Sequence, residues 1–587
     1  MINLLKYKTL ILLLFWASSC AQLETTDSNK KLHEIFQSHW EWNLKSYPEW
    51  STYEGRTEYN HLWTDRSKEA IEARKQAVRD LQAELKNFNS SKLTPENKAL
   101  FEIFKNEIDE SVKDQQFPSE LQTLNQMYGF QSQVPRLLEI MPKKRVTDYE
   151  AIFARLNSLP ENLEQQKALL REGLKLGVTP PQITLQSLTT QFKKLTITRK
   201  NENPLLIPFE NLPVDWSEKD RTIIKEKLET LFNETVFPAI KKFTLFLEDE
   251  YIPNTRKSTA MSAMPNGVAW YQHMIQSHTT TDLTAEQIHQ IGLDEVKRIR
   301  QEMANLAKKM NFQGPLEDFI QYLLTDKKYY FEREEDLLEA YQALCKRIDA
   351  NVAKLFYTLQ RTPYAVEKMP AHSAIASPAA LYHGGNLKTG RAGIFYVNTS
   401  SLKSRPRWEM EALALHEAVP GHHLQISLAQ EMENMPEFRK RGGYTAFVEG
   451  WGLYAEALGK EIGFFQEPSS DFGRLSFEMW RAVRLVVDTG LHALGWDRQR
   501  AIEYFVKNSG RPPSEAVIEV DRYIVRPGQA LAYKIGELKI WELRRLAEKE
   551  LGDKFDVRDF HDQVLKNGGV PLSLLENNIQ SWIMARK

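Results

Sequence analysis

Apolar residues recur along much of the chain at three- and four-residue spacing, with charged and polar residues between them. The pattern is clearest in residues 67–87 and 95–113. It predicts amphipathic helices, because this spacing places the apolar side chains on one face of a helix. We therefore expect residues 32–255 to form a succession of helices that builds one wall of a cleft.

Two segments of the second half carry sharper local signals. Thr284 and Gln287 fit a capping box, which predicts that a helix begins there. Residues 394–398, Ile-Phe-Tyr-Val-Asn, are mostly β-branched or aromatic and are flanked by glycine and serine, which predicts a strand. The expected fold is therefore mainly α, with a small β-sheet near the segment that carries the chemistry.

The N-terminal residues have the pattern of an export signal. A basic start precedes an apolar stretch at residues 9–16, which is too short for a permanent membrane span. The Ser-Ser-Cys sequence that ends at Cys20 resembles a lipobox. We interpret residues 1–19 as a signal peptide and 20–31 as a tether lipidated on Cys20. The protein would then be a periplasmic lipoprotein, anchored in the outer membrane, that meets the membrane only through this lipid. The alternative is a soluble exported protein.

Composition adds two constraints. The formal net charge is −1, with basic and acidic residues interspersed, which gives no reason to expect a nucleic-acid partner. The chain has two cysteines, Cys20 and Cys345, so lipidation of Cys20 leaves no intrachain disulfide. Stability must then come from a core, and we expect residues 32–587 to form a single helical domain whose catalytic half is about 360–540.

Residues 411–425, EALALHEAVPGHHLQ, have the residue types of a catalytic zinc site. His416 and Glu417 lie on an apolar helical lead-in, and His422 and His423 follow six and seven positions after His416. Imidazoles bind zinc, and a glutamate beside them can act as general base. In the usual arrangement the two ligands are four residues apart and share a helix face.

The longer spacing requires a distorted helix. Seven residues of an undisturbed helix span roughly 10 Å, too far for two nitrogens that each bind one zinc at about 2.0–2.1 Å. Pro420 and Gly421 are expected to overfill the helix with a bulge that brings His422 to the usual ligand position. The alternative is a helix that simply ends at Pro420, with histidines that bind nothing.

A second motif supplies carboxylates. Glu449 and Glu456 in the apolar segment 444–458 are seven residues apart, hence on one face of a predicted helix. A buried carboxylate is costly unless it is paired or bound to metal. We expect Glu449 to be the third ligand and Glu456 to orient a ligand imidazole, although the two roles could be exchanged.

The sequences HEAVPGHH and FVEGWGLYAE resemble the bacterial family called domain of unknown function 885. That family is similar to the helical gluzincin peptidases, which include thimet oligopeptidase, angiotensin-converting enzyme and the Taq-type carboxypeptidases. The resemblance places His416, His422 and Glu449 at zinc-ligand positions and Glu417 at the position of the base. The two-residue insertion before Gly421 departs from the pattern, and it leaves open whether His422 or His423 is the ligand.

The same resemblance implies a large helical, two-walled cleft that admits short or unfolded peptides. In those peptidases an edge strand binds the substrate backbone, which assigns this role to residues 394–398 and makes Tyr396 a candidate substrate contact; a plain strand in a small sheet is the alternative. Their C-terminal tyrosines donate to the oxyanion, which suggests Tyr533, with Tyr523 in reserve.

A polar line runs along the predicted helix at residues 472–496. Arg484 and Asp488 are four residues apart and can pair on one face. Alternatively, Arg481 or Arg484 could bind a substrate carboxylate, for which the guanidinium geometry is well suited.

The sequence thus predicts a zinc-dependent hydrolase that cleaves peptide bonds, with His416, His422 and Glu449 holding Zn²⁺ and Glu417 activating water. Two other functions use the same residues: a zinc hydrolase of non-peptide amides or esters, and a non-catalytic periplasmic binding lipoprotein.

Overall fold

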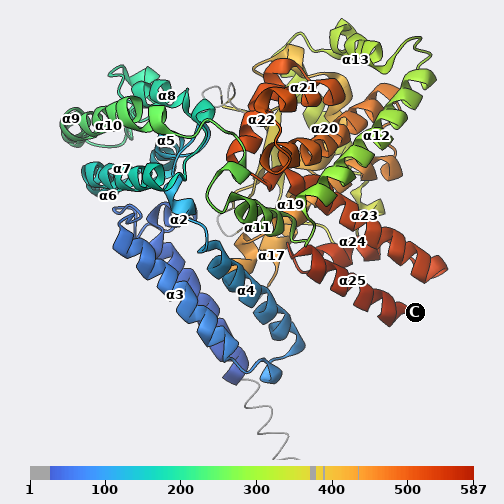
Figure 1. Ribbon diagram of the computed structural model, residues 1–587, viewed down its shortest axis with the longest axis horizontal. Coiled ribbons are helices and arrows are strands. Elements are labelled where there is room, and N and C mark those ends of the chain that lie inside the picture. The colour runs from blue at the N-terminus through green and yellow to red at the C-terminus, as the bar shows by residue number, and fades with distance from the viewer. Residues whose placement is uncertain (1–26, 371–373, 375–377, 388–389, 434) are drawn as a thin grey trace, which may run out of the picture. The chain divides into compact units, whose positions relative to one another are not determined.

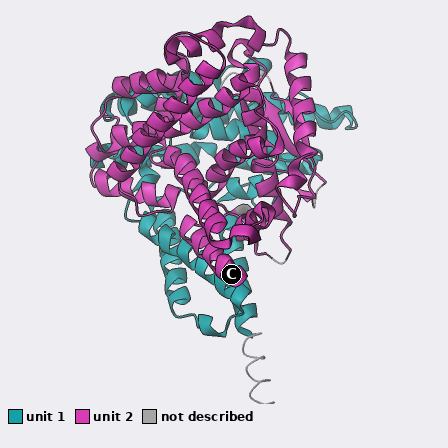
Figure 2. Ribbon diagram, turned by 90° about the vertical axis from the view of Figure 1, so that its right-hand side faces the viewer, with its two compact units in different colours: residues 1–257 teal, residues 258–587 magenta. Residues whose placement is uncertain are grey.

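The computed structural model describes residues 27–370, 374, 378–387, 390–433 and 435–587, and these residues are mainly helical, as expected (Figure 1). The predicted signal peptide and Cys20 lie outside the described residues. The chain divides into two compact units, residues 1–257 and 258–587 (Figure 2). Among the described helices, none has the length and apolar character needed to cross a membrane.

The N-terminal unit consists of helices around an apolar core. The two predicted helices are confirmed as α3 (Lys68–Lys86) and α4 (Pro95–Asp114). Ser67 and Thr94 cap them, because their side-chain oxygens accept hydrogen bonds from amides three residues further on. The unit also contains α2 (Pro48–Tyr53), α5 (Phe130–Ile140), α6 (Val146–Asn157), α7 (Leu159–Leu176), α8 (Leu188–Lys194), α9 (Glu218–Leu231) and α10 (Phe237–Phe246).

The C-terminal unit is organised around α20 (Pro468–His492), a helix in which nearly every residue is buried. It packs on α12 (Ala285–Lys309), which begins with the predicted Thr284–Gln287 capping box. Gly292 permits this contact, since a Cβ there would lie 2.8 Å from the side chains of Leu485 and Val486. The unit also contains α11 (Gly267–Thr279), α13 (Leu316–Thr325), α14 (Glu334–Asp349), α16 (Met410–Glu417), α17 (His422–Glu431), α18 (Glu437–Arg441), α19 (Thr445–Leu458), α21 (Arg498–Ser509), α22 (Pro513–Val525), α23 (Ala532–Leu551), α24 (Val557–Leu565) and α25 (Leu572–Arg586).

A three-stranded sheet precedes α16 in the chain. Its strands are β1 (Tyr364–Lys368), β2 (Ala380–His383) and β3 (Gly393–Val397), in the order β1-β3-β2. The predicted strand at 394–398 is therefore confirmed as β3, but its predicted role at the edge is wrong. β3 pairs with β1 in parallel and with β2 in antiparallel fashion, so its backbone groups are used on both sides and no peptide can add to it.

Helices α19 and α23 approach each other at glycine. A Cβ on Gly536 would lie 1.9 Å from the carbonyl oxygen of Ala446, and a Cβ on Gly450 would lie 2.5 Å from the backbone of Gly536. Neither backbone can retreat without opening the helix contact. The two glycines therefore fix the separation of α19, which carries Glu449, from α23, which carries Tyr533.

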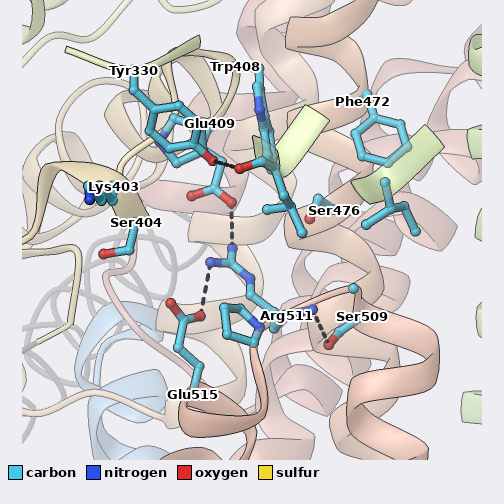
Figure 3. A pocket seen from close by; sticks show the side chains of 15 residues that line it. Tyr330, Lys403, Ser404, Trp408, Glu409, Phe472, Ser476, Ser509, Arg511 and Glu515 are labelled. Carbon is cyan, nitrogen blue, oxygen red and sulfur yellow. Dashed lines mark hydrogen bonds and ion pairs between the residues drawn. The ribbon is translucent and has the colours of Figure 1, made fainter. Parts of the chain in front are cut away.

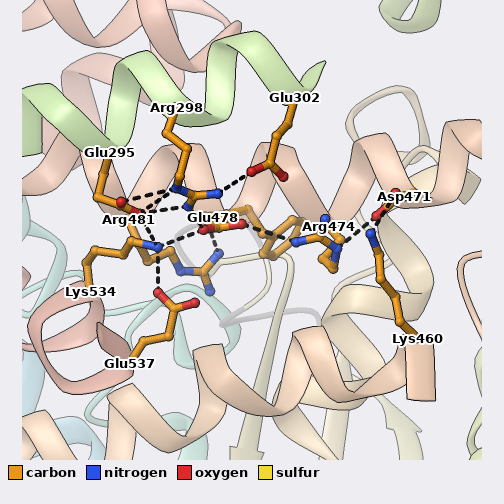
Figure 4. Close-up of polar contacts among 11 residues, drawn as sticks. Glu295, Arg298, Glu302, Lys460, Asp471, Arg474, Glu478, Arg481, Lys534 and Glu537 are labelled. Atoms are coloured by element: carbon orange, nitrogen blue, oxygen red, sulfur yellow. Dashed lines mark hydrogen bonds and ion pairs between the residues drawn. The ribbon is translucent and has the colours of Figure 1, made fainter. Parts of the chain in front are cut away.

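A buried charge network joins α12, α20 and α23 (Figure 4). The ammonium of Lys534 lies 2.7 Å from Glu478, 2.9 Å from Glu295 and 2.6 Å from Glu537. The side chain of Lys534 is 1 % exposed, so its charge would be costly without these carboxylates. The network anchors the first turn of α23, where the neighbouring residue is Tyr533.

We expect Gly536→Ala to lower the free energy of unfolding by about 1–3 kcal/mol or more, because the added methyl group meets backbone rather than a flexible side chain. Urea denaturation measures the change. Glu542→Ala, at an exposed position of the same helix, is the control and should stay within about 0.5 kcal/mol of the parent chain. Equal stability of the two variants would contradict the close crossing.

Candidate metal centre

The chain breaks into two helices between the predicted ligands. Four residues separate α16 (Met410–Glu417) from α17 (His422–Glu431), and the Val419–Pro420 peptide bond among them is cis. The amide of His423 donates to the carbonyl of Ala418 at 3.1 Å, a turn one residue wider than an α-helical one. The prediction of one bulged, overfilled helix is therefore wrong in form, because the backbone leaves the helix and re-enters it.

The connection between the helices is tightly packed. A Cβ on Gly421 would lie 1.9 Å from the carbonyl oxygen of His416, so the turn closes only with glycine at this position. The indole nitrogen of Trp451, on α19, donates to the carbonyl of Pro420 at 2.8 Å. These contacts hold His422 close to His416 and fasten both to the helix that carries Glu449.

His416, His422 and Glu449 come together as one cluster. Each offers one ligand atom, and the three atoms lie within 4.8 Å of one another. The Glu449 carboxylate oxygen Oε2 is 3.8 Å from Nε2 of His416 and 3.6 Å from Nε2 of His422. The two imidazole rings have centroids 4.6 Å apart and lie at 84° to each other.

These separations suit a zinc ion. Tetrahedral ligands at about 2.0–2.2 Å from zinc are separated from one another by roughly 3.3–3.6 Å, and the two measured nitrogen–oxygen distances are within about half an ångström of that range. Two neutral imidazoles and one carboxylate form the donor set of catalytic zinc sites, in which the fourth position is open. The residues present therefore fit the metal.

The cluster is electrostatically coupled without a metal ion. Burial acts to raise the pKa of Glu449, but the nearby imidazoles of His416 and His422 hold it well below its ordinary value. Burial acts to lower the pKa of His416, yet the nearby carboxylate of Glu449 and the hydrogen bond with Glu456 raise it to about 9. A proton on His416 thus balances the buried acid, a role that a divalent cation also fills.

Glu456 lies behind His416. A 2.8 Å hydrogen bond joins its carboxylate to Nδ1 of His416, which leaves Nε2 directed at Glu449. Arg481 lies 3.3 Å from the same carboxylate oxygen. Glu456 is 1 % exposed, so the structure brings Glu449 into the cluster and Glu456 to the orienting position that was predicted for it.

One residue of the centre was missed by sequence reasoning. Gly452 faces the His416 ring, and a Cβ there would lie 2.7–3.1 Å from three atoms of the imidazole. The spacing in EGWG could have indicated this residue, because Gly452 is three positions after Glu449 and such residues lie on the same helix face. Only glycine leaves room for the ring.

His423 lies outside the cluster, in a pocket of aromatic residues. A 2.8 Å hydrogen bond joins its Nδ1 to the hydroxyl of Tyr382, and its ring lies 4.6 Å from that of Tyr364. Burial lowers the pKa of His423 to about 4, so the ring is neutral. Of the two candidate histidines, His422 is the one near Glu449.

Glu417 is the last residue of α16 and directly follows His416. It is half-buried, and its carboxylate forms no hydrogen bond or ion pair with any side chain in the described part of the chain. Its carboxylate is thus not held by a structural partner. Tyr396 lies on β3, with its ring edge-on to His383 at 5.2 Å.

Tyr533 lies near the cluster at the start of α23. Burial, followed by the charge of Glu449, raises the pKa of its hydroxyl, so that the group stays protonated and able to donate. The guanidinium carbon of Arg484 lies 4.3 Å from the Tyr533 ring centre. Arg484 also donates to Glu519 at 3.2 Å and to the hydroxyl of Tyr523 at 3.1 Å, which fixes the surface that supports Tyr533.

Two sequence expectations for this region are wrong. Tyr523, the reserve donor, is 1 % exposed and donates to Glu519 at 2.6 Å, so its hydroxyl is held in the interior. Asp488 does not pair with Arg484. Its carboxylate accepts from the Tyr271 hydroxyl at 2.5 Å and from the Gly528 amide at 3.0 Å, because these groups face it from other elements.

Residues 48–579 match the family described as "Bacterial protein of unknown function (DUF885)". The chain belongs to the DUF885 family. Among solved structures, "the putative lipoprotein from Colwellia psychrerythraea" is 26 % identical with a TM-score of 0.90, covering 95 % of this chain and 100 % of that one. A "putative lipoprotein of unknown function from Shewanella oneidensis" is 17 % identical with a TM-score of 0.75, covering 94 % and 99 %. No curated protein matches the sequence.

A small cavity lies at the start of the helix that carries His416 in this DUF885 chain (Figure 3). Its volume is about 140 Å³, and Arg511 lies between Glu409, at 2.9 Å, and Glu515, at 3.3 Å. Glu409 is seven residues before His416, or about 10 Å along a helix. The ion pairs therefore anchor the beginning of α16 at a distance from the metal centre.

Burial raises the pKa of Asp488 to about 7, although hydrogen bonds from Tyr271 and Gly528 oppose the rise. The folded protein thus keeps a proton that the unfolded chain releases near pH 4, and the stability due to this group falls as pH rises from about 4 to 7. We therefore expect the free energy of unfolding of Asp488→Asn, relative to that of the parent chain, to be roughly 2–3 kcal/mol higher at pH 8 than at pH 5. Denaturant unfolding at both pH values measures it, and a pH-independent difference would contradict an Asp488 protonated at neutral pH.

Proposed function

We propose that this DUF885 protein is a zinc-dependent hydrolase that cleaves peptide bonds of short or unfolded peptides. The observation that carries the proposal is the convergence of His416, His422 and Glu449 within 4.8 Å, next to a carboxylate, Glu417, that has no structural partner among the described side chains. The resemblance of these motifs to helical gluzincin peptidases supports peptides as the substrate class, by analogy.

His416, His422 and Glu449 would hold the zinc, with Glu456 fixing the orientation of the His416 ring through Nδ1. When bound, zinc lowers the pKa of a coordinated water to about 7 and polarises the scissile carbonyl. Glu417 takes the proton from the attacking water and passes it to the leaving amine. The Tyr533 hydroxyl, protonated at neutral pH, donates a hydrogen bond to the oxygen on which negative charge develops.

Tyr396 is proposed as a substrate contact, and Arg484 as a residue that positions Tyr533. The guanidinium of Arg484 is buried against Glu519 and Tyr523, so it acts on substrate chiefly by supporting the Tyr533 ring. Tyr396 contacts substrate through its side chain, because the backbone of β3 is already paired.

We also propose that the chain is exported and lipidated on Cys20. The basic and apolar start followed by Ser-Ser-Cys supports this, as do two structural relatives described as lipoproteins. The lipid anchor of this proposal lies in the outer membrane.

The metal ligands are tested by a matched pair of neighbouring histidines. We expect His422→Asn to weaken zinc affinity by more than about 100-fold, since loss of a direct ligand costs more than the 10–100-fold typical of an outer partner. His423→Asn should bind zinc as the parent chain does. Competition with a chromophoric chelator measures both affinities. Loss of zinc in the His423 variant alone would reverse the ligand assignment.

The general base is tested by Glu417→Gln. We expect hydrolysis of a peptide library to fall by about 100-fold or more, while zinc content, measured by mass spectrometry, stays at the parent level. Small amides and esters assayed in parallel separate a peptidase from a hydrolase of other substrates. Unchanged peptide hydrolysis in this variant would refute the mechanism.

A further inference from the structure

The N-terminal unit contains a large cavity within residues 43–166. Its volume is about 800 Å³, within the range of roughly 300–1,000 Å³ that small-molecule sites occupy. Helices α2, α5 and α7, the end of the helical segment before α2, and the adjoining loops supply the walls. None of the residues proposed for hydrolysis belongs to it.

Aromatic rings gather at this cavity. Tyr47, Tyr53 and Tyr128 line it while remaining 38 %, 42 % and 37 % exposed. Trp50 and Trp63 contribute to the same wall. Arg74 lies 5.5 Å from the Tyr47 ring centre and Arg136 5.7 Å from the Tyr53 ring centre. The remaining ring surfaces are rigid and flat, which suits an aromatic ligand at low conformational cost.

The wall is held in place by hydrogen bonds. The indole nitrogen of Trp63 donates to the carbonyl of Arg155 at 2.6 Å, and the Arg155 guanidinium lies 5.5 Å from the Trp63 ring centre. The next residue, Thr64, donates its amide to Glu49 at 3.1 Å and accepts from Asn162 at 3.2 Å. The cavity is therefore preformed, which lowers the entropic cost of binding.

The lining carries positive charge without enough acid to balance it. Arg66 and Arg136 line the cavity together with one carboxylate, Glu49, whose Oε2 already accepts from the amide and hydroxyl of Thr64. Neither arginine forms an ion pair with any residue in the described part of the chain, and Nε of Arg66 is buried with no hydrogen-bond partner. A buried guanidinium N–H that lacks an acceptor is costly, and a carboxylate is the ligand that best removes this cost.

We propose that this cavity binds an aromatic carboxylate, with the ring between the tyrosines and tryptophans and the carboxylate on Arg66 and Arg136. Two sources share this chemistry: a free aromatic amino acid, and the C-terminal residue of a peptide that ends in one. The site binds without the metal centre, so it does not depend on the proposed hydrolysis.

Calorimetry on the intact chain, treated with chelator, tests the proposal. The first probes are N-acetylphenylalanine and its neutral amide, which differ only in the carboxylate. We expect the acid to bind with a dissociation constant on the order of 1 mM or tighter, and the amide at least about tenfold more weakly. Equal binding of acid and amide would overturn the proposal, because a neutral site would then suffice. If acetate bound as tightly as N-acetylphenylalanine, the aromatic rings of the cavity would have no role in binding, which would also overturn the proposal.

Two substitutions locate the site. We expect Arg66→Gln to weaken binding of the acid by about tenfold and to leave binding of the amide unchanged. Arg136→Gln is a second variant, to be used should the first fail to fold. Arg199→Gln, at a side chain 75 % exposed in the same unit and absent from the cavity wall, is the control. Acid binding that survives both cavity substitutions would place the ligand elsewhere and refute the assignment.

A peptide pair distinguishes the two sources and separates this proposal from the proposed hydrolysis. Tripeptides ending in phenylalanine, as acid and as amide, are titrated into the Glu417→Gln chain, in which cleavage is suppressed. Tighter binding of the tripeptide acid than of free phenylalanine identifies a peptide terminus, and the reverse order identifies the free amino acid. Acid binding that also disappears in His422→Asn would show that the metal centre, not this cavity, holds the ligand.

Discussion

The negative charge of Glu449 must be balanced where it lies, and the rest of the centre follows from this requirement. The carboxylate extends from α19 among packed helices, where an isolated anion would be strongly disfavoured. The neighbouring imidazoles supply the balance, through a proton on His416 or through a divalent cation held by both rings. The same need explains why Glu456 takes the far nitrogen of His416, which leaves only Nε2 to face the acid.

Helix α19 is the element on which these contacts meet. It carries Glu449 on one side of the His416 ring and Glu456 on the other, and Gly452 between them leaves space for the ring. Two residues before Gly452, Gly450 lets α23 approach closely, so that the helix with Tyr533 is placed by the same backbone. A shift of α19 would therefore move the Glu449 carboxylate, the His416 imidazole and the Tyr533 phenol together.

Local patterns in the sequence predicted much of this arrangement, because they depend on neighbours along one helix. The periodic apolar residues of α3 and α4, the cap at Thr284 and the shared face of Glu449 and Glu456 are of this kind. What failed depends on distant partners. The β3 strand was recognised, but its central place is decided by β1 and β2. Asp488 offered a local partner four residues away, yet it bonds Tyr271, 217 positions distant.

The network around Lys534 has a further consequence for how the protein responds to its medium. Dissolved ions weaken attractions that they can surround, within a screening length of about 8–10 Å in ordinary saline. The side chain of Lys534 is 1 % exposed, whereas the surface pair Arg171–Glu250 has side chains 51 % and 42 % exposed. Dissolved ions therefore reach the Arg171–Glu250 pair but not the ammonium of Lys534. Salinity can therefore vary around the molecule while the first turn of α23, and the phenol beside Lys534, keep their place.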